Sequence, residues 1–153
     1  LEAPGDRRWA WYRDLKGRVV RMEQPGSAPV RFAFDADGYT THIETEDGRS
    51  TRQTWDANGR LTRVDWPGGK SSRYTYDLEG RLLTAEADEQ RPVKRSYDVD
   101  GRLVFEQQGD EWLRFGYSAG GRRLRRTTSW DDESRLTWAP TGALASLRDA
   151  LGG

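Results

Sequence analysis

The chain has 153 residues, and its 25 basic side chains are balanced by 25 acidic ones. This length fits one domain or part of one, while a hydrophobic content of 34% argues against a thick core. The absence of Cys and the presence of a single histidine, His42, exclude disulfides, thiol nucleophiles, Cys-ligated metals and His-cluster metal sites. Seven Trp, six Tyr and four Phe argue against simple disorder. No apolar run approaches the roughly 18 residues of a membrane span.

A short pattern recurs along the chain: an aromatic residue, Asp, two variable residues, Gly, Arg and Leu. Its Asp position recurs at almost constant spacing, at Asp14, Asp35, Asp56, Asp77, Asp98, Ser118 and Ala139. Three positions after each anchor stands a glycine: Gly17, Gly38, Gly59, Gly80, Gly101, Gly121 and Gly142. Because repeats in phase determine the whole fold, this period is the main signal in the sequence.

Each repeat also has a second turn signal about halfway to the next anchor. In chain order these signals are Pro25-Gly26, Asp47-Gly48, Pro67-Gly68-Gly69, Asp88-Glu89, Gly109-Asp110, residues 131–134 and residues 149–153. The segments between turns are rich in Thr, Val, Trp, Tyr and Phe, which is typical of strands. In the Asp-x-x-Gly turn, Asp can accept a bond from a downstream backbone N–H and Gly can adopt a positive φ. The sequence therefore predicts an all-β fold of tandem 21-residue hairpins.

Seven hairpins give about fourteen strands, more than open sheets carry without curling. We therefore expect a long, curved, antiparallel sheet whose neighbouring units contact mainly each other. The segments 60–66 and 81–87 have no wholly apolar alternate set, so at least one face is wet. With a two-residue turn loop, the aromatic residue and the Arg of one repeat would lie opposite each other, and a change of one residue would reverse this.

The tail allows a second interpretation, because Leu144, Leu147 and Leu151 have the spacing of an amphipathic helix capped by Gly152. The repeat register instead places Trp138, Gly142 and Leu144 in a seventh hairpin. We expect the hairpin. We also expect a lead-in over residues 1–8, a repeat array over residues 9–153, and a longer product of which this chain is a fragment, since it begins with Leu1 and its only Met is Met22.

The repeats resemble the YD repeat of Rhs proteins, most closely in Tyr74-Thr-Tyr-Asp-Leu-Glu-Gly-Arg-Leu82 and Ser96-Tyr-Asp-Val-Asp-Gly-Arg-Leu103. The resemblance covers residues from about 9 to 153. It implies a segment of the β-shell of a bacterial polymorphic toxin, of the Rhs or insecticidal toxin-complex type, in which many repeats wind around a C-terminal toxin domain. Related repeats occur in teneurins, animal adhesion proteins. No position matches the family's cleavage motif, so no catalytic residue is carried over.

The resemblance also implies partners and a location. The partners would be further YD repeats of the same polypeptide, the enclosed toxin domain, and secretion-spike or chaperone proteins. The product would be exported in bacterial competition, with type VI secretion as one route. We expect neither enzymatic activity nor a cofactor, nor binding to nucleic acid.

Other clusters favour simpler interpretations. Asp35-Ala-Asp-Gly38 resembles the opening of a calcium loop, but its Gly stands at position four instead of six. Glu44 with Glu46, or Asp131 with Asp132 and Glu133, would need a cleft to act as a glycosidase pair. His42 has no ligating partner. The basic run 122–126 would be divided between two faces of a strand, in a chain without a positive surplus.

One functional alternative remains open. Rings that recur once in every repeat could stack on sugars, so a carbohydrate or cell-surface binding module is the second hypothesis. Its natural contacts would be Trp55, Tyr76 and Trp138. The shell segment is the first hypothesis.

Overall fold

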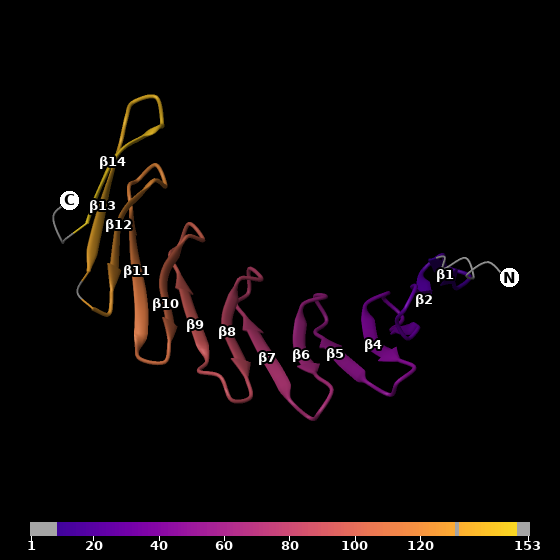
Figure 1. The fold of residues 1–153 in the computed structure, drawn as a ribbon. Coiled ribbons are helices and arrows are strands. Elements are labelled where there is room, and N and C mark those ends of the chain that lie inside the picture. The colour runs from indigo at the N-terminus through magenta and orange to yellow at the C-terminus, as the bar shows by residue number, and fades with distance from the viewer. Residues whose placement is uncertain (1–8, 131, 150–153) are drawn as a thin grey trace, which may run out of the picture. The chain divides into compact units, whose positions relative to one another are not determined.

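The computed structural model describes residues 9–130 and 132–149, so the expected lead-in at residues 1–8 lies outside the described residues (Figure 1). All regular structure in the described residues is β-strand. The strands are β1 (Ala10–Arg13), β2 (Val19–Glu23), β3 (Val30–Phe34), β4 (Thr40–Thr45), β5 (Ser50–Trp55), β6 (Leu61–Asp65), β7 (Ser71–Tyr76), β8 (Leu82–Ala87), β9 (Val93–Tyr97), β10 (Leu103–Gln108), β11 (Glu111–Tyr117), β12 (Arg123–Thr128), β13 (Glu133–Trp138) and β14 (Leu144–Asp149).

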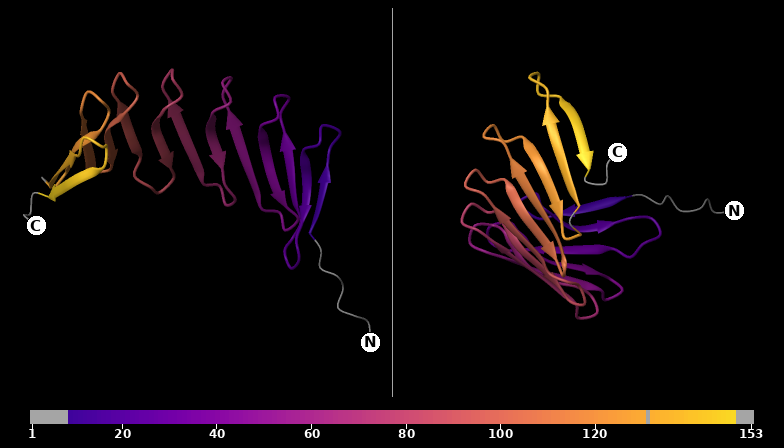
Figure 2. Two further views of the ribbon diagram at one scale, coloured as in Figure 1. Left: turned by 90° about the horizontal axis from the view of Figure 1, so that it is seen from above. Right: turned by 90° about the vertical axis from the view of Figure 1, so that its left-hand side faces the viewer.

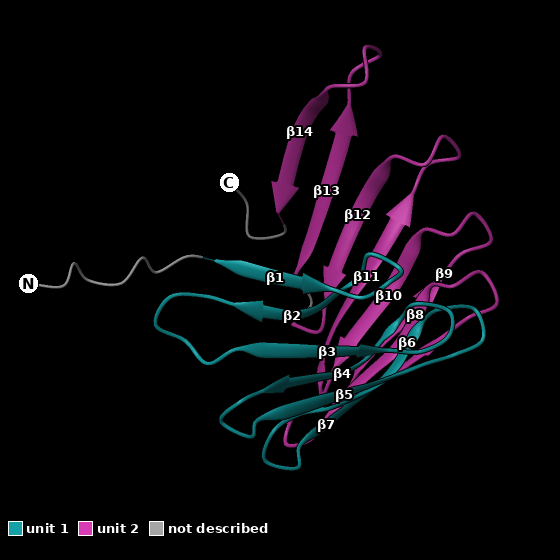
Figure 3. Ribbon diagram, turned by 90° about the vertical axis from the view of Figure 1, so that its right-hand side faces the viewer, with its two compact units in different colours: residues 1–73 teal, residues 74–153 magenta. Residues whose placement is uncertain are grey.

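The strands follow one another in the sheet in chain order, from β1 to β14, without a crossover. Figure 2 shows each strand followed by its antiparallel neighbour across a short turn. The chain divides into two compact units, residues 1–73 and 74–153, with the division inside β7 (Figure 3). The prediction of an all-β antiparallel repeat fold is confirmed.

The hairpin turns are longer than two residues. Trp55 lies opposite Leu61, and residues 56–60 form the loop between them. Two backbone bonds close this loop, from Asp56 N to Arg60 O at 2.9 Å and from Gly59 N to Asp56 O at 3.0 Å. The register shifts by one residue next to Trp55. The ring therefore faces the Leu position of its own repeat, and the arrangement of ring opposite Arg, which a two-residue loop would give, does not occur.

The strands present two different faces. Along β3 the exposure alternates, with Val30, Phe32 and Phe34 half-buried and Arg31 and Ala33 exposed. We call the side bearing the ring that ends each odd-numbered strand from β3 to β13 the aromatic face, and the other side the polar face. The core is thin: Val64, 2% exposed, is the one fully buried hydrophobic side chain among the described residues.

The last described segment is a strand, not a helix. Leu136 pairs with Leu147 and Trp138 pairs with Leu144 in an antiparallel register. The hairpin is therefore the correct interpretation for residues 144–149, and Leu151 lies outside the described residues. Backbone bonds within the Ala139 turn, including Ala139 N to Ala143 O at 2.9 Å, set this register as in the earlier repeats.

Candidate interaction surfaces between the repeats

The turn aspartate organises its own loop through both carboxylate oxygens. Asp56 Oδ1 accepts bonds from the backbone N–H groups of Asn58 (2.9 Å) and Arg60 (3.0 Å), while Oδ2 accepts from Arg60 Nε at 2.7 Å. The pairing of Asp Oδ2 with the Nε of the Arg four residues on recurs in three other repeats, at Asp14, Asp77 and Asp98. We call this arrangement the Asp–Arg turn.

The Asp–Arg turn holds the aspartate in its charged form. The backbone N–H of Arg60 and, against the opposing effect of burial, the Arg60 guanidinium lower the pKa of Asp56. Burial alone would raise the pKa of Asp98, but the backbone and side-chain bonds from Arg102 outweigh it and lower that pKa. Ionised aspartate is thus part of the folded turn.

The turn glycine supplies a positive φ in every repeat and, in some repeats, room for a neighbouring side chain. All seven adopt a positive φ: Gly17 (80°), Gly38 (96°), Gly59 (74°), Gly80 (85°), Gly101 (82°), Gly121 (79°) and Gly142 (91°). A Cβ at Gly59 would also collide with Tyr39 Oη, and a Cβ at Gly101 would lie 3.2 Å from Arg81 Nη1. Tyr39 and Arg81 belong to the preceding repeats, so the glycine leaves room for a neighbour as well as for the turn.

The backbone turn persists where the aspartate is replaced. Ser118 Oγ accepts a bond from Arg122 N at 3.1 Å. Ala139 has no side-chain acceptor, yet Gly142 N still donates to Ala139 O at 2.9 Å. The glycine and backbone therefore suffice for the loop, and the aspartate adds side-chain bonds to it.

The arginine of the pattern reaches into the following repeat. Arg102 Nη1 donates to Ser118 O at 3.2 Å, and its guanidinium lies over the Tyr117 ring, 5.2 Å from the ring centroid. Two other repeats show the same pair of contacts: Arg18 with Asp35 O and the Phe34 ring, and Arg81 with Asp98 O and the Tyr97 ring. A cation over a ring and a charge-assisted bond to a carbonyl both attract. This arginine therefore links one repeat to the next.

The tip of the aromatic ring reaches back in the opposite direction. Trp55 Nε1 donates to Thr40 O at 2.7 Å, and Tyr97 Oη donates to Leu82 O at 2.9 Å. Tyr117 and Trp138 make equivalent bonds, at 2.8 Å each, to Leu103 O and Arg123 O. In one repeat Tyr39 replaces the arginine and stacks on Trp55 with a centroid distance of 5.1 Å. The ring and the arginine together form a brace between successive repeats.

The three rings considered as glycan contacts all end odd-numbered strands. Trp55, Tyr76 and Trp138 are half-buried. Trp55 has Tyr39 stacked on it and its indole N–H bonded to Thr40. Trp138 bonds to the backbone of Arg123. At least these two rings thus already contact protein through part of their surface.

The remaining described candidate residues contact other side chains and backbone without forming a shared site. Asp35 Oδ1 accepts from Tyr39 N at 2.8 Å. Glu46 forms ion pairs with Arg21 and Arg31, and His42 Nε2 lies 3.8 Å from Glu44 Oε2. Across the described ranges no cluster of three or more His, Asp or Glu side chains is arranged to hold a metal, and no helix could cross a membrane. Asp131 lies outside the described residues.

The basic run 122–126 is divided between the two faces of β12. The Arg123 guanidinium lies over the Phe115 ring, 5.6 Å from its centroid, and Arg126 pairs with Phe115, so both belong to the aromatic face. Arg125 pairs with Gly116 and belongs to the polar face. Arg122 Nη1 donates to Ala139 O at 3.3 Å in the next turn.

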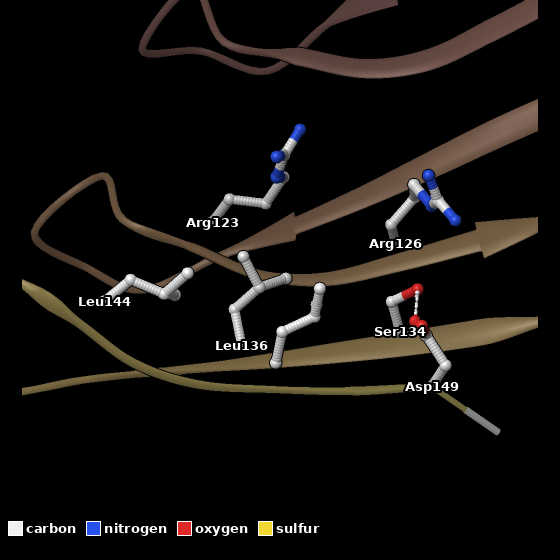
Figure 4. A pocket seen from close by; sticks show the side chains of 7 residues that line it. Arg123, Arg126, Ser134, Leu136, Leu144 and Asp149 are labelled. Carbon is white, nitrogen blue, oxygen red and sulfur yellow. Dashed lines mark hydrogen bonds between the residues drawn. The ribbon is translucent and has the colours of Figure 1, made fainter. Parts of the chain in front are cut away.

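A pocket opens on the aromatic face of the last three strands (Figure 4). It has a volume of about 420 Å³ and is lined by Arg123, Arg126, Ser134, Leu136, Leu144, Leu147 and Asp149. Leu144 and Leu147 are 50% and 55% exposed. Within the described part of the chain, the buried Nε of Arg126 has no hydrogen-bond partner. The pocket therefore combines three leucine side chains with polar and charged groups, one of which carries an unsatisfied donor.

Comparison with known proteins finds similarity in both sequence and fold. A sequence model described as RHS Repeat matches residues 55–93. None of the curated proteins matches the chain in sequence. The fold is similar to a crystal structure of TcdB2-TccC3-Cdc42, with a TM-score of 0.74 and 18% identity over 97% of this chain.

Two further solved structures have the same fold. A crystal structure of TcdB2-TccC3 matches 94% of this chain with a TM-score of 0.73 and 18% identity. A Photorhabdus luminescens Tc holotoxin pore with a mutation in TccC3 matches 97% of this chain with a TM-score of 0.73 and 19% identity. This chain spans 9% of the length of each of these three solved chains. Residues 55–93 thus match the RHS repeat in sequence, and the chain shares its fold with these solved structures.

Proposed function

We propose that the chain is a structural segment of a toxin shell, in which successive RHS repeats build a wall around a toxin domain of the same polypeptide. The observation that carries this proposal is the brace between repeats. The arginine and the ring hold neighbouring repeats together and the turn glycine leaves room for the arginine, as seen at Arg102, Tyr117 and Gly121. A repeat whose arginine and aromatic ring contact the neighbouring repeats is suited to forming a continuous sheet.

The composition of the chain supports the same proposal. A shell made of one layer of sheet does not need a thick core, and Val64 is the one buried hydrophobic side chain among the described residues. Solved proteins of the same fold are Tc toxin structures. We propose that the chain is non-catalytic and acts within an exported bacterial product, with secretion-spike or chaperone proteins as further partners.

Protection from protease tests the proposal in the longer polypeptide. The domain that follows the array should be digested much more slowly with the repeats present than after their removal. A matched control carries Gly59→Val and Gly101→Val, which weaken the turns without shortening the array. If the downstream domain is digested equally fast in all three proteins, the shell function is wrong.

The carbohydrate-binding alternative makes a different prediction. On that hypothesis the chain binds glycans through its rings, and Trp138→Ala, at the last ring, should weaken binding. On the shell hypothesis the same substitution lowers stability because Trp138 Nε1 no longer donates to Arg123 O. A glycan array measured together with thermal unfolding separates the two.

A further inference from the structure

Three arginines lie side by side on the polar face of the last three strands. Arg125 on β12 pairs with Arg135 on β13, and Arg135 pairs with Arg148 on β14. Neighbouring strands are about 4.8 Å apart, so the three side chains leave the sheet at closely spaced points. Like charges directly opposite each other in a sheet are destabilising. We call these three residues the arginine row.

The arginine row has too few carboxylates to balance it. Glu133 Oε1 accepts from Arg135 Nε at 2.5 Å, and Glu133 Oε2 lies 3.8 Å from Arg125 Nη1. No ion pair joins Arg148 to a carboxylate within residues 9–130 and 132–149. Three guanidinium groups and one carboxylate leave two positive charges in excess.

A second pair of facing arginines on the polar face is balanced. Arg21 pairs with Arg31 across β2 and β3. Glu23 and Glu46 provide two carboxylates for these two arginines, with N–O distances of 2.8, 3.2 and 3.4 Å. At Arg21 and Arg31 acids therefore neutralise the facing charges, whereas the arginine row has more arginines than carboxylates.

The arginine row is also accessible. The side chains of Arg125 and Arg135 are 56% and 75% exposed. A hollow of about 320 Å³ is lined by Glu133, Arg135, Arg148 and Asp149. Asp149 pairs with Ser134 and its carboxylate is bonded to Ser134 Oγ on the aromatic face, so Glu133, Arg135 and Arg148 are the charged side chains of the hollow on the polar face.

We propose that the arginine row binds a tetrahedral oxyanion, a phosphate or sulfate group. Guanidinium groups match such anions because each presents two parallel N–H donors, and two adjacent forks can bind different oxygens of one anion. Glu133 holds the Nε of Arg135 and so leaves its terminal nitrogens as the remaining donors. The anion supplies the missing negative charge and relieves the repulsion between facing arginines.

The proposal predicts that Arg148→Gln has opposite effects on stability without and with the anion, and thermal unfolding of the whole chain tests this. Arg148→Gln should keep or raise the Tm without anion, because it removes a repulsive neighbour. Sulfate at about ten times its Kd should raise the wild-type Tm by about 3–5 °C over sodium chloride of equal ionic strength, and Arg148→Gln should lose at least half of that rise. Because sulfate also stabilises proteins generally, a matched control is needed. Arg31→Gln serves as this control and should retain the full sulfate effect, since it leaves the arginine row intact.

The source of the oxyanion is distinguished by three ligands: inorganic sulfate, inorganic phosphate and a sulfated oligosaccharide. Tighter binding of the oligosaccharide per sulfate group, by tenfold or more, indicates a polymer that spans the row. Equal binding per group indicates a free ion. The proposal is overturned if Arg148→Gln and Arg31→Gln respond to every ligand as the wild type does, or if Arg148→Gln alone lowers the Tm without anion.

Discussion

The hairpin β5–β6 and the last described hairpin, β13–β14, share one design but differ sharply in burial. Val64 and Leu147 occupy the same position relative to the anchors of their repeats, Asp56 and Ala139. Val64 is 2% exposed, whereas Leu147 is 55% exposed. Strand β6 pairs with β5 and β7, while β14 pairs with β13 alone among the described strands. The hairpin itself therefore does not bury its apolar side chains.

Burial is supplied by the repeat that follows. The same contrast holds at the first residue of each second strand, where Leu61 is half-buried and Leu144 is 50% exposed. A repeat array keeps its hydrophobic contacts between units, so each unit is stable only with its neighbours. This also explains why a low apolar content is compatible with a defined fold.

Substitutions of turn glycines should give the largest change in the free energy of unfolding, and they test whether each repeat depends on its neighbours. Gly59→Ala should destabilise the chain by about 3 kcal/mol, because a positive φ and the close approach of Tyr39 both oppose a Cβ. Gly17→Ala should cost only about 1 kcal/mol, since Gly17 has a similar φ of 80° but no described atom within 4 Å of its Cβ position. Urea unfolding of both variants gives the two values. Equal values would mean that the preceding repeat does not contribute.

The two equivalent apolar positions give the next effect. Val64→Ala should lower the free energy of unfolding by about 2 kcal/mol, because it leaves a cavity in the one fully buried hydrophobic site described. Leu147→Ala should change it by less than about 0.5 kcal/mol, because more than half of that side chain is already exposed. Denaturant unfolding compares them directly. A larger loss at Leu147 would contradict the idea that burial comes from the following repeat.

The sequence was sufficient to predict the local structure. Asp56, Gly59 and their counterparts recur at fixed spacing, and a turn depends on residues within a few positions of one another. The brace was not predicted, because the sequence pairs the arginine with the ring of its own repeat only if the turn has two residues and indicates no contact with the next repeat. The structure pairs Arg102 with Tyr117, the ring of the following repeat, and the same relation holds for Arg18 with Phe34. Both members of each pair are visible in the sequence, but their contact depends on which strands lie side by side across the second turn.

The end pocket was also beyond prediction. Leu136, Leu144 and Leu147 come together only through the register of β13 against β14. The arginine row depends on the same kind of information, because Arg125, Arg135 and Arg148 stand on three different strands and meet only through their pairing. The net charge of the chain is zero and so gives no sign of such a row.

The arginine of the brace gives a smaller effect. Arg102→Met should lower the Tm more than Arg122→Met, because Arg102 contacts a carboxylate, a carbonyl and a ring. Arg122 keeps the bond to the next turn, at Ala139 O, but stands in a turn where Ser118 replaces the aspartate. Thermal unfolding under one set of conditions compares the two variants. If the order is reversed, the Asp–Arg turn is not the stabilising part of the brace.

The smallest effect for a single residue should appear in the pH dependence of stability. The folded chain lowers the pKa of Asp56, chiefly through the backbone N–H of Arg60, relative to about 3.9 in an unfolded chain. Protons therefore bind the unfolded state more readily, so the stabilisation by Asp56 is complete above about pH 5 and is lost as pH falls through the lower folded pKa.

Asp56→Asn removes this dependence. At pH 7 the variant should be less stable than the wild type, and the two unfolding midpoints in urea should converge as the pH is lowered from 5 toward 2.5. Asp37→Asn, at an exposed position inside another turn, is the matched control and should follow the wild type at every pH. Since Asp14, Asp77 and Asp98 have pKa values lowered by the same kind of bonds, the wild type should still lose stability in acid after this one contribution is removed. A gap between wild type and Asp56→Asn that stays constant from pH 7 to 2.5 would show that the charge of the turn aspartate does not stabilise the repeat.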